Sequence, residues 1–177
     1  MTTTLQIALL GVVQGLTEFL PVSSSGHLVL AQALLGVQTP AGATLEVALH
    51  AGSILSIACY YRRRLLAMAA GLLRREPAAW SLAVNVLVAA VPVLILYPLC
   101  GDRIEAQFDE PRRVAVLLCV TGLLLLSSRW APLGTALPRP RSALVMGLAQ
   151  ALALLPGISR SGSTLVAARW QRLAPAA

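Results

Sequence analysis

Residues 5–37 read "LQIALLGVVQGLTEFLPVSSSGHLVLAQALLGV", two strongly apolar runs on either side of the polar stretch "PVSSSGH" at 21–27. Each run is shorter than the roughly 20 apolar residues that a full helical crossing of a bilayer needs. Irregular backbone at membrane depth is tolerated only where protein covers it or where it lines a cavity. The stretch therefore predicts a broken helix whose unwound tip lies beside a polar cavity.

The composition of the whole chain supports a membrane setting. Of its 177 residues, 57% are hydrophobic and only 12% are charged, which is unusual for a soluble domain. We expect an all-α, polytopic integral membrane protein that forms a single membrane domain over 1–177. The apolar segments that predict helices cover residues 5–20, 27–37, 45–61, 79–100, 114–128 and 142–155.

The net charge of +7 comes from arginine alone among the basic side chains. The loops 60–77 and 129–141 are rich in arginine, whereas the loop 101–113 carries four acids against three arginines. The positive-inside rule places the first and third loops in the cytoplasm and the second outside. No basic stripe with interleaved aromatic residues is present in the sequence, so nucleic acid is not an expected partner.

A second copy of the opening pattern lies near the end of the chain. A shift of 136 residues aligns "GVVQGLTEFLPVSSSGHL" with "GLAQALALLPGISRSGST", and the matches fall on polar positions. Three full crossings lie between the copies, so the repeats are expected to be inverted in the membrane. The first repeat would cover about 1–135 and a partial second repeat about 136–177. On this reading a complete protein would be longer, so we expect the chain to be truncated.

The polar residues of the two copies together suit phosphoryl transfer. Gln14 and Glu18 lie one helical turn apart, where they could hold a divalent cation or orient a nucleophile. Arg160 could neutralise phosphate oxygens, and either Ser24 or His27 could attack phosphorus. The remaining candidate phosphate-binding residues are Ser23, Ser25, Gly26, Gly157, Ser159, Ser161 and Thr164.

Each feature also has a purely structural interpretation. The serines of "SSSGH" could form only a helix cap and turn, and Glu18 could pair with an arginine for stability. His50 is interpreted as a packed or hydrogen-bonded polar residue, with Glu46 and Ser53 as weaker candidates for the same cavity. The functional hypothesis depends on the conjunction of the two motifs.

The segments "QGLTEFLPVSSSGH" and "PGISRSGST" resemble the two signature motifs of the undecaprenyl-diphosphate phosphatases, the bacitracin-resistance family of bacterial membrane enzymes. Gln14 and Glu18 match the first pattern, residues 23–27 the second, and residues 156–164 the third, while "LEVALHAGSILSI" is also similar to the family. The apolar helices that follow the last motif in the family are absent from the sequence given.

The resemblance implies a multi-pass enzyme of the bacterial inner (plasma) membrane, with its site toward the outer face. Its substrate would be undecaprenyl diphosphate, which loses its terminal phosphate to give the carrier lipid for peptidoglycan synthesis. The resemblance further implies a divalent cation, Mg²⁺ or Ca²⁺, and it marks Glu18, His27 and Arg160 as essential, with Ser24 at the site. Membrane lipids are expected partners, and a homodimer is one compatible oligomeric state.

Three rival interpretations remain at this point. Lipid phosphatases of the phosphatidic acid phosphatase type share SGH and SR motifs, but they need a lysine and a later histidine that this sequence lacks. An inverted-repeat transporter or flippase would use Glu18 and His27 as proton-relay groups and release no phosphate. A truncated, inactive remnant would retain the motifs without activity.

Overall fold

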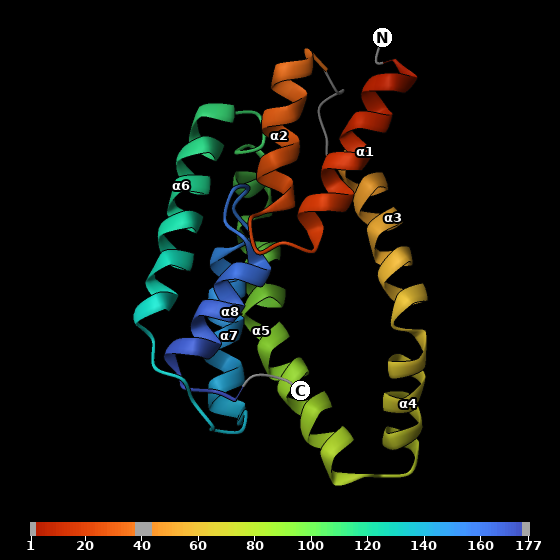
Figure 1. The fold of residues 1–177 in the computed structure, drawn as a ribbon, viewed down its shortest axis with the longest axis vertical. Helices are drawn as coiled ribbons and strands as arrows, with labels where there is room; N and C mark the ends of the chain where they lie inside the picture. The colour runs from red at the N-terminus through yellow and green to blue at the C-terminus, as the bar shows by residue number, and fades with distance from the viewer. Residues whose placement is uncertain (1–2, 38–43, 175–177) are drawn as a thin grey trace.

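The computed structural model describes residues 3–37 and 44–174, and these residues form an all-α fold (Figure 1). Within these ranges the only β-type pairing is an isolated bridge between Ala136 and Leu173. The helices are α1 (Thr4–Glu18), α2 (Ser24–Leu35), α3 (Thr44–Tyr60), α4 (Arg62–Leu73), α5 (Pro77–Glu105), α6 (Pro111–Ser127), α7 (Pro140–Leu152) and α8 (Arg160–Trp170), with a short 3₁₀ turn at Ser128–Trp130.

Among the described residues, two helices are long and apolar enough to cross a bilayer. They are Pro77–Glu105, with mean hydropathy 2.3, and Pro111–Trp130, with mean hydropathy 1.5. Most of their side chains are exposed, including Leu87, Leu94 and Leu123. Apolar surface of this extent is unfavourable in water and favourable against lipid. The fold is consistent with an all-α membrane protein whose outward apolar faces would contact lipid.

Two helical hairpins approach each other with their tips (Figure 1). One is formed by α1 and α2, which pack around Leu10, Leu28 and Val37, and the other by α7 and α8. Figure 1 shows the α1–α2 hairpin extending from its tip toward one end of the molecule and the α7–α8 hairpin toward the other. The predicted broken helix pair at the N-terminus is thus present, and the second motif forms a similar pair in the opposite sense.

The two tips share the same type of helix-capping hydrogen bond. Ser23 caps α2 and its hydroxyl accepts from the Gly26 N–H at 3.3 Å, while Ser159 caps α8 and accepts from the Gly162 N–H at 3.0 Å. Serine stabilises a helix start in this way because it satisfies a backbone donor that has no partner in the first turn. The interpretation of the serines of "SSSGH" as a helix cap is correct for Ser23, and Ser159 makes the equivalent cap in the second motif.

The contact between the tips is reciprocal. A Cβ atom on Gly26 would lie 2.8 Å from the Gly157 Cα, and one on Gly162 would lie 2.8 Å from the Pro21 carbonyl oxygen. Gly157 itself has φ +99°, a conformation that other residues rarely adopt. Under the 136-residue shift, position 26 corresponds to 162 and position 21 to 157. The contact between 26 and 157 is therefore the counterpart of the contact between 162 and 21. This is the pattern that a two-fold relationship between the tips requires.

The second tip is fixed to α6 by Thr121. Its buried hydroxyl donates to the Gly157 carbonyl at 2.7 Å and accepts from the Ser159 N–H at 3.1 Å. Because α6 also packs on α2, one helix supports both hairpins at their meeting point. Thr121 thereby sets where the second motif lies relative to the first.

The arginine-rich segment 60–77 was predicted to be a loop, but the structure has a helix there. Residues 62–73 form α4, which continues from α3 after a turn at Tyr61. The segment is rich in arginine, leucine and alanine, which are all strong helix formers. Its charges suggested a loop, but charge does not oppose a helix whose surface is polar.

Candidate active site

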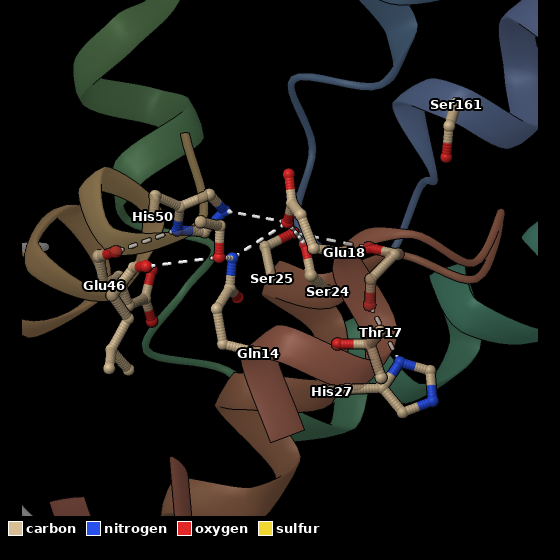
Figure 2. Close-up of polar contacts among 12 residues, drawn as sticks. Gln14, Thr17, Glu18, Ser24, Ser25, His27, Glu46, His50 and Ser161 are labelled. Carbon is tan, nitrogen blue, oxygen red and sulfur yellow. Dashed lines mark hydrogen bonds and ion pairs between the residues drawn. The ribbon is translucent and has the colours of Figure 1, made fainter. Parts of the chain in front are cut away.

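A cavity of about 710 Å³ lies where the two hairpin tips face α3 and α5. Its volume is in the range of small-molecule sites in proteins. Its polar wall is formed by residues from both motifs and from α3 and α5: Thr17, Glu18, Ser23, Ser24, Ser25, Glu46, His50, Tyr97, Glu105, Gln150, Ser159, Arg160, Ser161 and Thr164. Figure 2 shows the part of this wall around Glu18.

The Glu18 carboxylate is the centre of a hydrogen-bond cluster (Figure 2). Its Oε2 accepts from the Ser24 hydroxyl at 2.6 Å and from the Gln14 amide at 2.8 Å. Glu18 is the last residue of α1 and Ser24 the first of α2, so the irregular tip between them brings the two groups together. A hydroxyl that donates to a carboxylate can lose its proton to it, which is the arrangement of an activated nucleophile.

Helix α3 approaches this cluster with two polar groups. The Nε2 of His50 lies 3.8 Å from Glu18 Oε2, and the Ser53 hydroxyl lies 3.4 Å from the Gln14 amide nitrogen. The side chains of His50 and Glu18 are only 34% and 25% exposed. His50 therefore belongs to the cluster. The sequence predicted a packed or hydrogen-bonded polar residue at this position but did not predict its contact with Glu18.

His27 has a different environment. Its Nδ1–H donates to the Ser23 carbonyl at 2.8 Å, within the first turn of α2. The ring is not part of the cavity wall, and Figure 2 shows it pointing away from Glu18 and His50. The role that the resemblance assigns to His27 stays a prediction. In this arrangement the contact that the ring makes is with the backbone of Ser23, a residue held at φ +69°.

The second motif supplies the cationic side of the cavity. Arg160 is the first residue of α8 and lies on the cavity wall, and it takes part in no ion pair with any residue of the described ranges. Ser159 and Ser161 approach each other at 3.2 Å, as Ser23 and Ser25 do at 3.3 Å in the first motif. The hydroxyls of both tips thus face one space.

The structure brings together most of the residues predicted from sequence. Glu18, the three serines of the first tip, and Ser159, Arg160, Ser161 and Thr164 line the cavity. Gln14 contacts Glu18 from behind, and the closely packed Gly26 and Gly157 allow the tips to meet. The sequence reasoning did not select Tyr97 and Glu105, whose side chains hydrogen-bond at 2.9 Å on the α5 wall. The two residues are eight positions apart in an apolar helix, and this spacing gives little indication in the sequence that they contact each other or line a site.

Two helix N-termini lie at the same cavity, those of α2 and α8. Backbone N–H groups without helical partners and the positive ends of the helix dipoles favour an anion at such a point. Arg160 adds a full positive charge whose planar fork matches phosphate oxygens. The arrangement can bind a phosphate group and place it beside the Ser24–Glu18 pair.

The protein alone supplies only some of the ligands that a divalent cation would need at this site. The carboxylates on the wall are Glu18, Glu46 and Glu105, and no group of three histidine, cysteine or acidic residues suited to a metal occurs in 3–37 and 44–174. Magnesium is commonly held by one or two carboxylates together with substrate phosphates. The residues therefore fit a cation shared with a phosphorylated substrate, with Glu18 as its protein ligand and Gln14 behind it.

Comparison with known proteins agrees with the motifs. Residues 7–177 match the family described as bacitracin resistance protein BacA. The chain is 43% identical over 182 residues to the undecaprenyl-diphosphatase of Salinibacter ruber and 38% identical over 168 residues to that of Sphingopyxis alaskensis. It is 40% identical over 168 residues to the undecaprenyl-diphosphatase of Azospirillum brasilense.

The matches cover nearly all of this chain's length but a smaller share of the length of each relative. The match covers 94% of this chain and 67% of the Salinibacter protein, and 92% of this chain and 63% of the Sphingopyxis protein. For the Azospirillum protein the shares are 92% and 89%. The chain thus spans about two thirds of the length of several curated relatives that it matches.

Proposed function

Because the chain belongs to the bacitracin resistance protein BacA family, we propose that it is a membrane hydrolase that removes the terminal phosphate of undecaprenyl diphosphate. The product, undecaprenyl phosphate, would be the carrier lipid returned to cell-wall synthesis. The relatives named undecaprenyl-diphosphatase support this assignment. The protein would lie in the bacterial inner membrane as a multi-pass protein, with the substrate lipid and membrane lipids as its partners.

The observation that carries the proposal is the short contact between Ser24 and Glu18 on a cavity shared with Arg160. A carboxylate 2.6 Å from a hydroxyl is placed to take its proton. A guanidinium and two helix N-termini on the same wall are placed to stabilise the charge of a phosphoryl group. Ser24 is therefore the nucleophile in this proposal, in preference to His27, whose ring is outside the cavity wall.

In the first step Ser24 Oγ bonds to the terminal phosphorus and its proton passes to Glu18. The bond from that phosphorus to the bridging oxygen breaks, and undecaprenyl phosphate departs with the electron pair and receives the proton from Glu18. In the second step Glu18 takes a proton from water as the water oxygen attacks the phosphoserine. The Ser24 oxygen leaves phosphorus and regains a proton from Glu18, which releases inorganic phosphate.

The other residues bind and orient. Arg160 pairs with the oxygens of the transferring phosphoryl group, and the hydroxyls of Ser159 and Ser161 are within the same wall. A bound Mg²⁺ or Ca²⁺ would supply charge neutralisation of the diphosphate at Glu18. His27 acts in this scheme through its hydrogen bond to the Ser23 carbonyl, which holds the tip beside the nucleophile.

The repeat arrangement supports the same site. We assign the first tip to a repeat of about 1–135 and the second to a repeat that begins at about 136. Inverted repeats place substrate sites where their broken helices meet, and the reciprocal glycine contacts lie at that point. A homodimer stays a compatible oligomeric state.

The test is phosphate release from undecaprenyl diphosphate by the purified chain in detergent. We expect release by the wild type, a loss of at least about 10²-fold in Ser24→Ala, and no loss in Ser81→Ala, which removes an exposed hydroxyl at the start of α5. A folded wild-type chain that moves the lipid across a bilayer without releasing phosphate would favour the flippase hypothesis. Equal rates in the two serine variants would refute the assignment of the nucleophile.

A further inference from the structure

Five arginines lie around the point where α6 ends, α7 begins and α8 ends (Figure 1). They are Arg129, Arg139, Arg141, Arg169 and Arg172, and with their neighbours in 127–142 and 169–174 they are called the basic junction below. Among the described residues their guanidinium groups take part in no ion pair, and the sequence has no aspartate or glutamate after Glu110. The positive charge of the basic junction is therefore left for a partner outside the chain to neutralise.

Side-chain hydrogen bonds hold the three helix ends together. The Trp170 indole N–H donates to the Ser127 hydroxyl at 3.3 Å, and the Gln171 amide donates to the Ser142 carbonyl at 3.4 Å. Each of these four residues lies one or two positions from an arginine of the basic junction. Residues far apart in the sequence are thus gathered on one surface.

The loop 131–139 is fixed against the end of α8. The Ala136 N–H donates to the Arg172 carbonyl at 3.1 Å, and the Ala174 N–H donates to the Ala136 carbonyl at 2.9 Å. Gly134 lies so close to Arg172 that a Cβ atom would collide with the Arg172 carbonyl. The loop is therefore held at a defined place beside the arginines of α8.

Large apolar side chains are exposed on the same surface. Leu133 and Leu137 of the loop are 78% and 76% exposed, and Trp130 and Trp170 are exposed as well. Tryptophan is typical of the headgroup level of a bilayer, because its ring is apolar and its N–H is polar. A phospholipid offers a phosphate to arginine and acyl chains to leucine, whereas a free phosphate ion would match only the charges. The composition of the basic junction therefore fits a phospholipid.

Arg172 has a backbone conformation that arginine does not favour. Its φ is +56°, and it follows the cap of α8. Its N–H donates to the Arg169 carbonyl at 3.0 Å, and the Leu173 N–H donates to the Ala168 carbonyl at 3.1 Å. Glycine is the usual residue at such a helix end, because it adopts a positive φ without strain. Backbone preference therefore gives no reason for an arginine here, and what the arginine adds is its charge.

We propose that the basic junction binds an anionic phospholipid, with the phosphate against the arginines and the acyl chains against Trp130, Leu133 and Leu137. Guanidinium groups pair well with phosphate oxygens, and basic surfaces at helix ends are suited to anionic headgroups. Helix α8 runs for 11 residues from Arg160 at the cavity to Trp170 at the junction, so about 15 Å separates the two sites. The junction is thus a second lipid site, and it does not depend on the proposed function.

The test measures lipid binding through the tryptophans of the junction. The chain has three tryptophans, so Trp80→Phe gives a parent protein in which Trp130 and Trp170 are the reporters. Phosphatidylglycerol or phosphatidylcholine with brominated acyl chains, which quench tryptophan fluorescence, is titrated into this protein in a neutral detergent. We expect saturable quenching by phosphatidylglycerol at a concentration at least about tenfold below that needed for phosphatidylcholine, because only the first carries a net negative charge.

Arg172→Gly is the most informative variant, because it removes a charge and relieves the backbone together. One arginine near an anionic lipid surface contributes about fivefold to affinity, so this variant should bind about fivefold more weakly. Its unfolding temperature in detergent should be at least that of the parent, since glycine adopts the positive φ freely. Arg129→Gln, Arg141→Gln and Arg172→Gly combined should weaken binding about 10²-fold. Arg112→Gln, which removes an exposed charge at the other end of α6, is the matched control and should bind like the parent.

Four results would overturn the proposal. Equal quenching by the two lipids would show apolar contact without recognition of the headgroup. Parent-like affinity in the triple variant, or in Arg172→Gly if the triple variant does not fold, would show that the arginines do not recognise the lipid. An equal loss in Arg112→Gln would assign the effect to net charge. Displacement of the lipid by the same concentration of inorganic phosphate would indicate a site for the ion alone. Binding is measured without turnover, so a chain that releases no phosphate still tests the basic junction.

Discussion

Gly26→Ala tests whether the close approach of the two tips is what assembles the site. The added Cβ would lie 2.8 Å from the Gly157 Cα and 3.0 Å from Leu118 Cδ2. Ordinary contact begins at 3.4 Å, so the tips would have to separate by about 0.6 Å, because the Leu118 side chain can move aside but the Gly157 backbone cannot. We expect a loss of about 1–3 kcal/mol in stability from overpacking.

The catalytic loss should exceed the loss of stability. Ser24 and Glu18 are on one tip and Arg160 is on the other, so separation would move the proposed nucleophile away from the proposed phosphate-binding guanidinium. A displacement near 1 Å can cost about 10²-fold in rate. Phosphate release in detergent measures this, beside thermal unfolding of the same samples.

The matched control is Gly122→Ala on α6, where a Cβ would meet nothing within 4 Å. Glycine to alanine in an open helical position stabilises by about 0.5–1 kcal/mol, so this variant should be at least as stable as wild type and fully active. A Gly26→Ala protein with wild-type rate and unfolding temperature would refute the reasoning that the tips meet through this glycine pair.

Three further outcomes are expected. Thr121→Val should destabilise the protein by about 2 kcal/mol, because it leaves the Gly157 carbonyl and the Ser159 N–H without their partner; thermal unfolding measures the change, and an unchanged transition would contradict the anchoring role. Arg160→Ala should lose about 10²-fold in kcat. Arg160→Lys should lose at least about tenfold, since lysine keeps the charge but not the planar fork of donors. Equal rates in the two variants would argue against paired contacts between the guanidinium and phosphate. Chelation by EDTA should stop phosphate release and added Mg²⁺ or Ca²⁺ should restore it, whereas release that persists in EDTA would exclude a shared cation.

Much of the fold could be predicted because apolar length and polar interruption are local properties of the sequence. The apolar runs 79–100 and 114–128 correspond to α5 and α6, and the polar break at 21–27 is the turn between α1 and α2. The 136-residue shift also predicted which positions correspond, and the contacts of Gly26 and Gly162 agree with it. The all-α class with broken helix pairs is confirmed.

The membership of the site was less predictable because it depends on helical phase and packing between helices. His27 is three residues from Ser24 on the same helix, yet its ring turns back to the Ser23 carbonyl and leaves the cavity wall. His50 is 32 positions from Glu18 in the sequence, and only the packing of α3 on α1 brings the two together. A motif identifies residues within one segment, and it carries no signal for a partner on another helix.

The two tips are alike in sequence but unequal in chemistry, and this inequality would let a repeat form the single catalytic site of the proposed function. Equivalent serines cap both helices, and equivalent glycines allow the approach, so the repeat supplies the scaffold twice. The first tip places Ser24 where the second has Arg160, since 24 and 160 are corresponding positions. A hydroxyl and a guanidinium thus occupy the same place at the start of α2 and α8, on one cavity wall. In the proposed function the two-fold arrangement would present both groups to one phosphate, Ser24 to attack phosphorus and Arg160 to neutralise its non-bridging oxygens.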